Sequence, residues 1–385
     1  MKTNYTFSIY NTTTNLPEQW DDLAMSNVFL SKNYLEILEK SAPTNMICHF
    51  IGFFKDKELV GIAISQFLDA NKLESFGERD KCIKSSVRNF AFKNFCSHVL
   101  FMGNNMLTGQ NAFSFSDKID KKRAFELLKE SSEELKILFK NKGSKVHITT
   151  FKDFEECEII ALENSGFNEL YKFSIQPNMV FHIPKNWKTE QDYIDALSKK
   201  YRDQYKRARK KSLGIEKRKM DLDEIKNHEE TIYELYFHVA QNAPFNTFFL
   251  AKNHFSVFKE ILKDKFLFYG YFIDEKLVGF NTLIKNGPIM DTYFLGYDET
   301  IQREKMLYLN MLYDMIAYSI NKGFEEIVFA RTALEIKSSV GAKPIEMFGF
   351  IKHETKLIDK CMETLFNYLE PKVAWQERNP FKTLE

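Results

Sequence analysis

The most distinctive pattern in the chain is an apolar run, a charged turn and a second apolar run, and it occurs twice. Residues 50–61 read FIGFFKDKELVG, and residues 268–279 read FYGYFIDEKLVG. The two segments share seven identical positions without a gap. Two apolar runs that meet at a short polar turn predict a β-hairpin, so we expect one hairpin in each half of the chain.

The same series of landmarks follows each hairpin. It consists of an apolar segment ending in glycine, a helix with its apolar residues on one face, a Lys-Gly pair that ends this helix, a short strand and a Gly-Phe pair. In the first half these landmarks lie at 101–103, 128–139, 142–143, 146–151 and 166–167. In the second half they lie at 294–296, 309–320, 322–323, 327–330 and 349–350. The repeated order predicts a duplicated domain.

The order of elements within each half predicts the class of fold. A strand, a helix and a second strand form a right-handed parallel crossover, whereas the hairpin adds antiparallel strands. We therefore expect an α/β protein in which each half is a mixed sheet with helices packed on it. A chain of 385 residues is long enough for two such domains, which we place at 1–178 and 179–385.

The composition fits a globular protein and argues against several kinds of site. The net charge is only +1, which is unlike a globally basic nucleic-acid-binding protein. The five cysteines include no CxxC pair, and the eight histidines form no HxxxH motif and no cluster with cysteine. The sequence therefore predicts neither a disulfide framework nor a metal site.

The N-terminal residues and the uncharged segments predict a cytoplasmic protein. The first six residues, MKTNYT, lack the apolar stretch of a signal peptide. The longest uncharged run, residues 94–116, contains several asparagines and glycines. A membrane-spanning helix needs about 20 mostly apolar residues, so we expect no spanning segment there.

A strongly basic segment begins the second half. Residues 199–219 read KKYRDQYKRARKKSLGIEKRK, in which eleven of 21 residues are Lys or Arg. Tyrosines and small residues recur at spacings of three and four, which places them on one side of a helix and the cations on the other. This pattern fits a phosphate-binding face for a nucleotide, a diphosphate lipid carrier or RNA. It equally fits a solvated helix face whose lysine stems cover apolar surface.

Two segments and the duplication carry a resemblance to a known family. Residues 197–215 are similar to the K-x-R-x(5)-A-x-K segment that opens the second domain of FemABX-like transferases. Residues 331–342, RTALEIKSSVGA, look like the strand-end segment of FemAB-related members of the GNAT superfamily. FemABX proteins also consist of two GNAT-like domains, so the resemblance extends over nearly the whole chain.

The resemblance implies two tandem GNAT-like domains and an N-acyltransferase or aminoacyltransferase. The donor would be an acyl-CoA, an acyl carrier protein or an aminoacyl-tRNA, and the acceptor an amine, for example on a phosphate-bearing cell-envelope precursor. The first domain would be structural or hold the acceptor, and the second would be catalytic. The alternative is a noncatalytic, degenerate GNAT module that binds an anion or a nucleotide.

The sequence departs from GNAT enzymes that use CoA. Those enzymes usually carry a Gln/Arg-x-x-Gly-x-Gly/Ala loop whose backbone N–H groups bind the pyrophosphate at a helix start. After Gly296 this chain reads YDETIQREKMLYLNM, without a glycine. Acyl-CoA stays possible as a donor, but the usual loop is absent.

The resemblance singles out five candidate residues for binding and catalysis. Lys337 and Glu335 follow a predicted strand, where Lys337 can bind a phosphate or carboxylate and Glu335 can take the proton of the amine. Arg331 lies at the same strand end and can form paired hydrogen bonds with an anion. Lys200 and Arg202 fall on the family motif of the basic segment and are candidates for phosphate binding. In the alternative interpretation, Glu335 and Lys337 alternate on one solvated strand face.

Three further candidates lie on the strand that precedes the second periodic helix. Asp291, Tyr293 and Tyr297 would share one face of a regular strand. Asp291 can act as a base, and either tyrosine can donate a hydrogen bond to the oxyanion or protonate a leaving group. Both tyrosines fit equally well as core rings with one solvated end.

Overall fold

The computed structural model describes residues 4–25, 27–72, 95–242, 246–364 and 375–382. The chain forms two compact units. Unit 1 consists of Met1–Ile175, Thr247–Ala251 and Glu346–Lys372, and unit 2 of Gln176–Asn246, Lys252–Ile345 and Val373–Glu385. The chain thus changes from one unit to the other several times, which no local pattern in the sequence indicates.

Unit 1 is built on a mixed sheet in the order β1-β2-β3-β4-β6-β13. Only the β4–β6 pair is parallel, and the other neighbours are antiparallel. The strands are β1 (Tyr5–Tyr10), β2 (Met46–Lys55), β3 (Glu58–Asp69), β4 (His98–Met102), β6 (Ile148–Phe154) and β13 (Lys343–His353), with β5 (Phe113–Phe115) paired to β3. The helices are α1 (Trp20–Ala24), α2 (Lys32–Ser41), α4 (Lys121–Asn141), α5 (Glu156–Glu163) and α14 (Lys356–Asp359).

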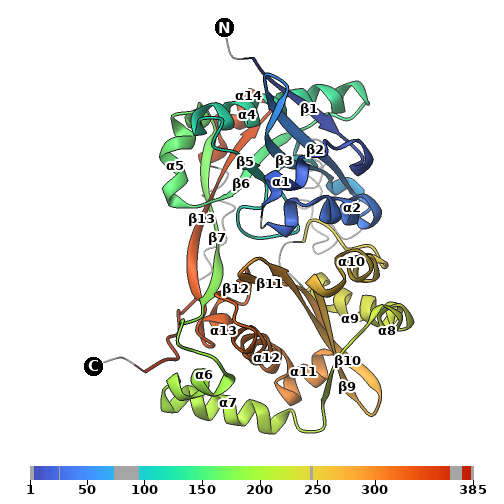
Figure 1. Cartoon of the computed structure of the whole chain (residues 1–385), viewed down its shortest axis with the longest axis vertical. Helices are drawn as coiled ribbons and strands as arrows, with labels where there is room; N and C mark the ends of the chain where they lie inside the picture. Colours follow the sequence, from blue (N-terminus) through green and yellow to red (C-terminus); the bar gives the residue numbers. More distant parts are fainter. Residues whose placement is uncertain (1–3, 26, 73–94, 243–245, 365–374, 383–385) are drawn as a thin grey trace, which may run out of the picture. The chain divides into compact units, whose positions relative to one another are not determined.

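Unit 2 repeats this plan with the order β7-β12-β11-β10-β9-β8. Its one parallel pair is β11–β12. The strands are β7 (Tyr171–His182), β8 (Glu216–Lys219), β9 (Phe266–Ile273), β10 (Lys276–Asn286), β11 (Ile289–Tyr297) and β12 (Glu326–Ala330). The helices are α6 (Glu190–Ala196), α7 (Lys199–Lys211), α8 (Leu222–Asn227), α9 (Glu229–Gln241), α10 (His254–Leu262), α11 (Glu299–Lys305), α12 (Leu307–Asn321) and α13 (Leu334–Ser338), which Figure 1 labels.

Both predicted hairpins are confirmed, as β2–β3 and β9–β10. The first turns at Asp56-Lys57 and the second at Asp274-Glu275, and all four residues have positive φ. Positive φ at both central residues is typical of a type I′ turn, whose twist matches that of the flanking strands. The predicted helix ends are also confirmed, because Gly143 and Gly323 follow α4 and α12 with φ of +82° and +75°.

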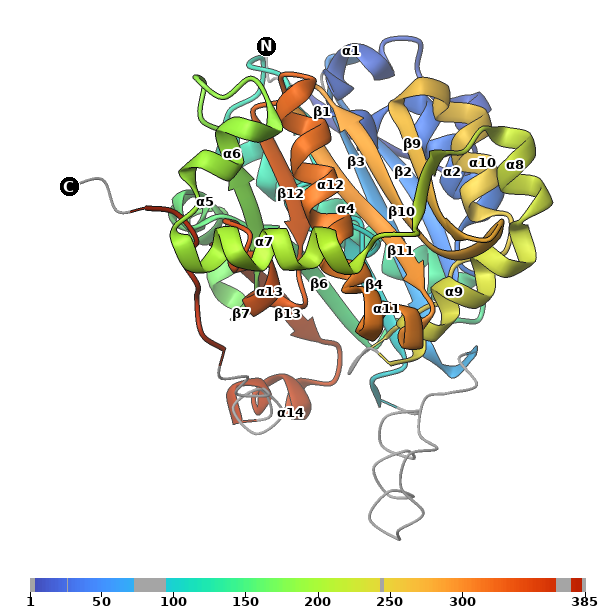
Figure 2. The ribbon, with the colours of Figure 1, turned by 90° about the horizontal axis from the view of Figure 1, so that it is seen from below.

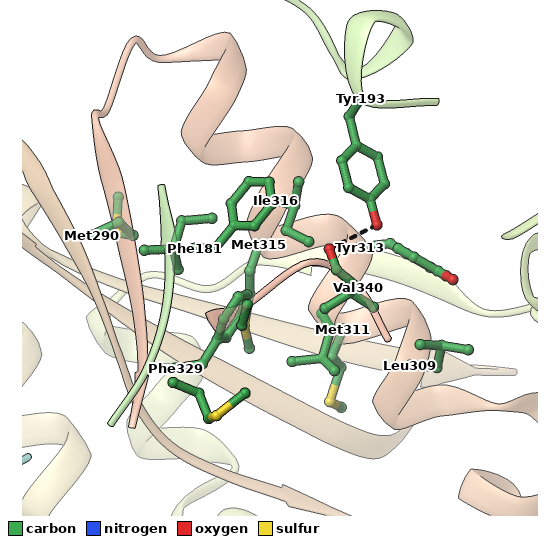
Figure 3. Close-up of a cluster of buried hydrophobic side chains, with 14 of the residues drawn as sticks. Phe181, Tyr193, Met290, Leu309, Met311, Tyr313, Met315, Ile316, Phe329 and Val340 are labelled. Carbon is green, nitrogen blue, oxygen red and sulfur yellow. Dashed lines mark hydrogen bonds between the residues drawn. The ribbon is translucent and has the colours of Figure 1, made fainter. Parts of the chain in front are cut away.

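The core of unit 2 lies between its sheet and the helices α6, α7 and α12. Figure 3 shows Met311, Met315 and Ile316 of α12 beside Phe329 of β12 and Phe181 of β7. The hydroxyl of the buried Tyr193 donates a hydrogen bond to the carbonyl of Val340 at 3.1 Å, which satisfies both polar groups inside this core. Figure 2 shows α12 and α7 on this face of the sheet. Helices α9 and α10 pack on the opposite face.

The two halves of the sequence exchange their last strands. Strand β7 follows α5 of the first half, but its residues Met179–His182 pair with β12. Strand β13 follows α13 of the second half, but its residues Phe348–His353 pair with β6. Each unit therefore completes its sheet with a strand from the other half of the sequence.

Candidate functional site

The parallel strands β11 and β12 separate shortly after they begin. They pair from Ile289 and Glu326 as far as Asp291 and Val328. Beyond this point β11 continues to Tyr297, whereas β12 ends at Ala330, opposite Met179 of β7. Divergence of neighbouring strands at their carboxyl ends is where α/β sheets tend to bind ligands.

The loop that follows β12 has an unusual backbone. Ala330, Thr332 and Ala333 have φ values of +58°, +71° and +47°. L-residues other than Asn and Asp rarely adopt this left-handed conformation, because it brings Cβ close to the following carbonyl oxygen. Such strain persists only where surrounding contacts hold it, and it is frequent at functional sites.

Lys337 provides the contact that holds this loop. Its side chain lies on α13 and is 4% exposed. Its Nζ donates hydrogen bonds to the carbonyl of Arg331 at 2.6 Å and to that of Ala330 at 3.3 Å. Burial lowers the pKa of this amine to about 7, so both its protonated and its neutral form are accessible near neutrality.

Glu335 lies on the same helix but faces away from Lys337. Residues two positions apart on a helix are separated by about 200° around its axis. The half-exposed Glu335 carboxylate accepts hydrogen bonds from the guanidinium of Arg378, one of them from Nε at 3.0 Å. The alternative in which Glu335 and Lys337 share a solvated strand face is wrong, because residues 334–338 form a helix.

Arg378 belongs to a C-terminal segment, residues 375–382, which no pattern in the sequence connects with the site. Its backbone N–H donates to Ser338 Oγ at 3.0 Å, and the carbonyl of Pro380 accepts from Ser198 N at 2.9 Å. Phe381 packs against Gly341, where a Cβ would lie only 2.6 Å from the ring. The segment thus connects α13 with the start of α7.

Arg331 is turned toward β7. Its Nε donates to the carbonyl of Gln176 at 3.2 Å. Burial lowers the pKa of its guanidinium to about 10, which still leaves the group protonated at neutral pH. Arg331 is therefore a fixed positive charge beside the left-handed loop.

Asp291 lies where β11 and β12 separate, and its side chain is 7% exposed. Burial raises the pKa of its carboxyl to about 7, and the nearby charge of Glu326 raises it further. The hydrogen bond that Oδ2 accepts from Asn286 Nδ2 at 3.1 Å acts in the opposite direction and lowers this pKa. Asp291 and Lys337 thus arrive at pKa values of about 7 from opposite directions. Neither group causes the shift of the other, because burial, Asn286 and Glu326 act on Asp291, whereas burial alone acts on Lys337. A strongly shifted pKa is, for each group by itself, typical of functional sites.

The expectation that Asp291, Tyr293 and Tyr297 share one face is wrong for Tyr297. Two residues of β11, Tyr293 and Phe294, stand opposite the single residue Thr282 of β10, which is a β-bulge. The extra residue reverses the alternation of side chains beyond it. Tyr297 consequently packs in the core on the α12 side, with its ring 6.2 Å from that of Tyr308. Burial there raises the pKa of Tyr297.

Tyr293, at the bulge, has a buried histidine as its partner. His254 begins α10, is fully buried, and its Nε2 lies 3.0 Å from Tyr293 Oη. The two rings are stacked with centroids 5.8 Å apart. No spacing in the sequence relates His254 to Tyr293, because α10 precedes the hairpin β9–β10 in the sequence and β11 follows it.

The two candidates on α7 differ in their environment. Lys200 is exposed, and its Nζ lies 5.3 Å from the centroid of the Tyr201 ring. Arg202 is half-buried, and its Nη2 donates to the carbonyl of Leu197 at 2.9 Å. Only Lys200 lies on the solvent face of the helix, and their role in phosphate binding stays a prediction.

Unit 1 also buries a lysine at the end of a strand. Lys152 of β6 is 6% exposed, and its Nζ donates to the carbonyls of Asn104 and Leu107, both at 3.0 Å. It forms an ion pair with Asp153, which is 1% exposed. The loop that Lys152 holds follows Gly103 and leads to β5, which pairs with β3.

The start of α11 does not fit the pyrophosphate of CoA in the usual GNAT manner. Asp298 caps this helix, and its carboxylate accepts from the N–H groups of Thr300 at 2.9 Å and Ile301 at 3.4 Å. The carboxylate thus engages the N–H groups that would bind a phosphate, and its charge repels one. In the part of the chain that the structure describes, no group of His, Cys, Asp and Glu could hold a metal ion, and no helix is long and apolar enough to cross a membrane.

The sequence matches no known family model and no curated protein. Its structure is similar to the crystal structure of FemX, with a TM-score of 0.55 and 13% identity over 95% of this chain and 100% of that chain. It is also similar to a conserved protein of unknown function from Bacteroides thetaiotaomicron (TM-score 0.50, 11% identity, 90% and 99% covered). A tandem GNAT protein from the clavulanic acid biosynthesis pathway matches with a TM-score of 0.46 and 10% identity, over 91% and 98% of the two chains.

Proposed function

We propose that this chain, whose fold is that of FemX-like proteins of the GNAT superfamily, transfers an acyl or aminoacyl group from an activated donor to an amine. The observation that carries the proposal is the buried Lys337, whose pKa is about 7 and which is held against a left-handed loop at the end of β12. Burying an amine without a carboxylate partner costs free energy, and a strongly shifted pKa of this kind is more frequent at functional sites than elsewhere.

The proposed reaction is a direct attack of the amine on the carbonyl carbon of the donor. A carbon–nitrogen bond forms, and the bond from that carbon to the leaving oxygen or sulfur breaks. Asp291, with a pKa of about 7, is the group we assign to take the proton of the amine. Protonated Lys337 and Arg331 supply positive charge for the developing oxyanion or for an anionic group of a substrate.

Tyr293 is the third group we assign to this centre. Its hydroxyl lies at the bulge in the middle of β11, and His254 fixes its orientation. A hydroxyl there can donate a hydrogen bond to the oxyanion or a proton to the leaving group. Glu335 is better explained as the ionic partner of Arg378, and Tyr297 as a core residue.

Two features support a division of roles between the units and a preference among donors. Lys152 in unit 1 is engaged by Asp153 and by its own loop, which favours a structural or acceptor-holding role for that unit. Asp298 engages the start of α11, which favours aminoacyl-tRNA or a carrier-bound thioester over acyl-CoA.

The test is a transfer assay read by mass spectrometry. Acetyl-CoA, an acyl carrier protein thioester and a mixture of aminoacyl-tRNAs serve as donors, and lysine, glucosamine and a UDP-linked peptidoglycan precursor as acceptors. We expect transfer from at least one donor, and a loss of about 100-fold or more in Lys337→Met, in the range typical of one general acid–base or oxyanion group. The control is Lys343→Met, an exposed lysine paired with Glu377, which should keep its rate.

A thermal-shift titration with each donor accompanies the assay. A donor present at 100 times its dissociation constant stabilises the native state by about 2.7 kcal/mol. Binding of a donor without transfer would favour the noncatalytic, degenerate module. Full activity of Lys337→Met would contradict the assignment of the site to the end of β12.

A further inference from the structure

Helix α7 is fixed to unit 2 by one side only. Tyr201 and Ala208 are buried in the core, and Arg209 forms ion pairs with Asp314 at 2.6 Å and with Glu190 at 2.9 Å. These contacts fix the rotation of the helix about its axis. The opposite side is therefore presented to solvent in one orientation.

This outward side is a cationic stripe. At 100° per residue, its cations lie within an arc of about 140° along a helix about 20 Å long. All are exposed, and in the described part of the chain none takes part in an ion pair. Asp203, the one acidic residue of the helix, is exposed and lies within the same arc, so the cations outnumber the acid six to one there. The cations of the stripe are Lys199, Lys200, Lys206, Arg207, Lys210 and Lys211.

An exposed apolar residue stands at the end of the stripe. Leu213 follows the C-cap residue Ser212 and is 71% exposed. Gly214, with φ of +87°, then turns the chain toward β8. A leucine at the edge of a cationic surface gains free energy when it enters the acyl region of a lipid layer, whereas it has no favourable partner on a phosphate backbone.

The aromatic residues of α7 do not reach this surface. Tyr201 is 7% exposed, and the hydroxyl of Tyr205 donates to Glu190 Oε1 at 2.7 Å on the side of the core. All residues of α7 are described, and none offers an exposed ring. Rings on which bases stack are the usual complement of cations in single-stranded nucleic-acid sites.

We infer that the cationic stripe of α7, with Leu213, docks unit 2 on an anionic lipid surface. Each basic residue near such a surface strengthens binding about fivefold, so six of them suffice for reversible attachment without a membrane-spanning segment. Because the stripe is solvent-exposed, its attraction is screened by salt. This attachment goes beyond the proposed transfer reaction and does not depend on it.

The experiment is co-sedimentation of the full chain with vesicles of phosphatidylcholine alone and of phosphatidylcholine mixed with phosphatidylglycerol. We expect binding only to the mixed vesicles, and weaker binding at higher salt. The triple variant Lys206→Glu/Arg207→Glu/Lys210→Glu should bind at least about 100-fold more weakly, since it removes three attractions and adds three repulsions. The matched control, Lys122→Glu/Lys140→Glu/Lys142→Glu, makes the same change of charge at exposed lysines of α4 and its end in unit 1, and should bind like the wild type.

Two further measurements, on the Leu213→Ser variant and with unfractionated tRNA, distinguish lipid from RNA as the ligand of the stripe. We expect Leu213→Ser to weaken vesicle binding several-fold, and unfractionated tRNA to bind less tightly than the mixed vesicles at physiological salt. The inference is overturned if the mixed vesicles do not bind, if the two triple variants bind equally, or if tRNA binds through the stripe while vesicles do not. Circular dichroism and thermal unfolding confirm that each variant is folded.

Discussion

Lys152 and Lys337 are the two buried lysines of the described residues, one in each unit, and both bind backbone carbonyls at the end of a strand. Lys152 also has a buried carboxylate, that of Asp153, as its partner. The partners of Lys337 are two carbonyls of a left-handed loop, and burial lowers its pKa to about 7. The comparison shows that an ion pair compensates the burial of one lysine, whereas the hydrogen bonds of the other go to backbone carbonyls.

The largest expected effect is that of Lys152→Met. The change leaves the carboxylate of Asp153 buried without its cation, which costs about 3–5 kcal/mol of unfolding free energy. Lys337→Met removes a buried amine that has no carboxylate partner among its hydrogen bonds, so we expect a cost below about 2 kcal/mol. Denaturant unfolding of both variants measures the difference. Adding Asp153→Asn to Lys152→Met should restore part of the stability. Equal losses of unfolding free energy in Lys152→Met and Lys337→Met would contradict the proposed difference between the two buried lysines.

The next effect is the dependence of stability on pH through Asp291. Its pKa is about 7 in the native state and about 3.8 in the unfolded state. Between these values the native state holds a proton that the unfolded state has released, so stability falls as pH rises from about 4 to about 7. The full difference is about 4 kcal/mol at 1.36 kcal/mol per pKa unit. Asp291→Asn should remove this fall, as measured by denaturant unfolding across that range.

Asp298→Asn is the control with the opposite sign. The hydrogen bond from Thr300 lowers the pKa of Asp298, so its contribution to stability is present above the unfolded pKa and disappears as the pH falls through the native one. Its variant should therefore lose stability at neutral pH and match the wild type in acid. A wild-type curve that is flat between pH 4 and 7 would contradict the burial of an ionisable Asp291.

Gly103 and Gly296, which occupy corresponding positions in the two halves, are expected to differ by a smaller free energy when each is replaced by alanine. A Cβ at Gly296 would lie 2.5 Å from backbone atoms of Leu235 and Tyr236, whereas Gly103 has φ of +144° and its nearest contact is at 3.3 Å. Gly296→Ala should cost about 1–3 kcal/mol and displace α9. Faster amide exchange at Leu235 and Tyr236 would report this displacement. Gly103→Ala strains only its own backbone and should leave exchange in its neighbouring helices unchanged.

The smallest effect is expected in the loop that Lys337 holds. Ala333 has φ of +47°, so Ala333→Gly relieves left-handed strain and should stabilise the protein by up to about 1 kcal/mol. Ala42→Gly, at φ of −60°, is the matched control and should cost about 0.5–1 kcal/mol. Thermal unfolding measures both. Destabilisation by Ala333→Gly as large as that of the control would mean that the loop is not strained.

Features set by neighbouring residues were predictable from the sequence. Each hairpin turns within two residues, and each Lys-Gly helix end depends on one glycine, so local patterns suffice. The burial of Lys337 was not predictable, because a five-residue helix leaves no periodicity to detect. The bulge at Tyr293 was also hidden, since the alternation of β11 looks regular until it is compared with β10.

Partners that are distant in the sequence were missed for a different reason. His254 and Arg378 contact Tyr293 and Glu335 across 39 and 43 residues, and no spacing rule connects them. The exchange of β7 and β13 was missed because it depends on which strand each of them pairs with in the folded chain, β12 for β7 and β6 for β13. Sequence patterns identify a strand but not its neighbour.

The exchanged strands also determine when this protein can finish folding. Ile351 of β13 pairs with Thr150 of β6, and Val180 of β7 pairs with Val328 of β12. At about 5–20 residues per second, a ribosome needs roughly 10–40 s to synthesise the chain between β6 and β13. The edge of β6 is exposed throughout that interval and is open to pairing with other chains. A chain cut between the two halves would lack β13 as a partner for β6, so neither half contains all the strands of its own sheet.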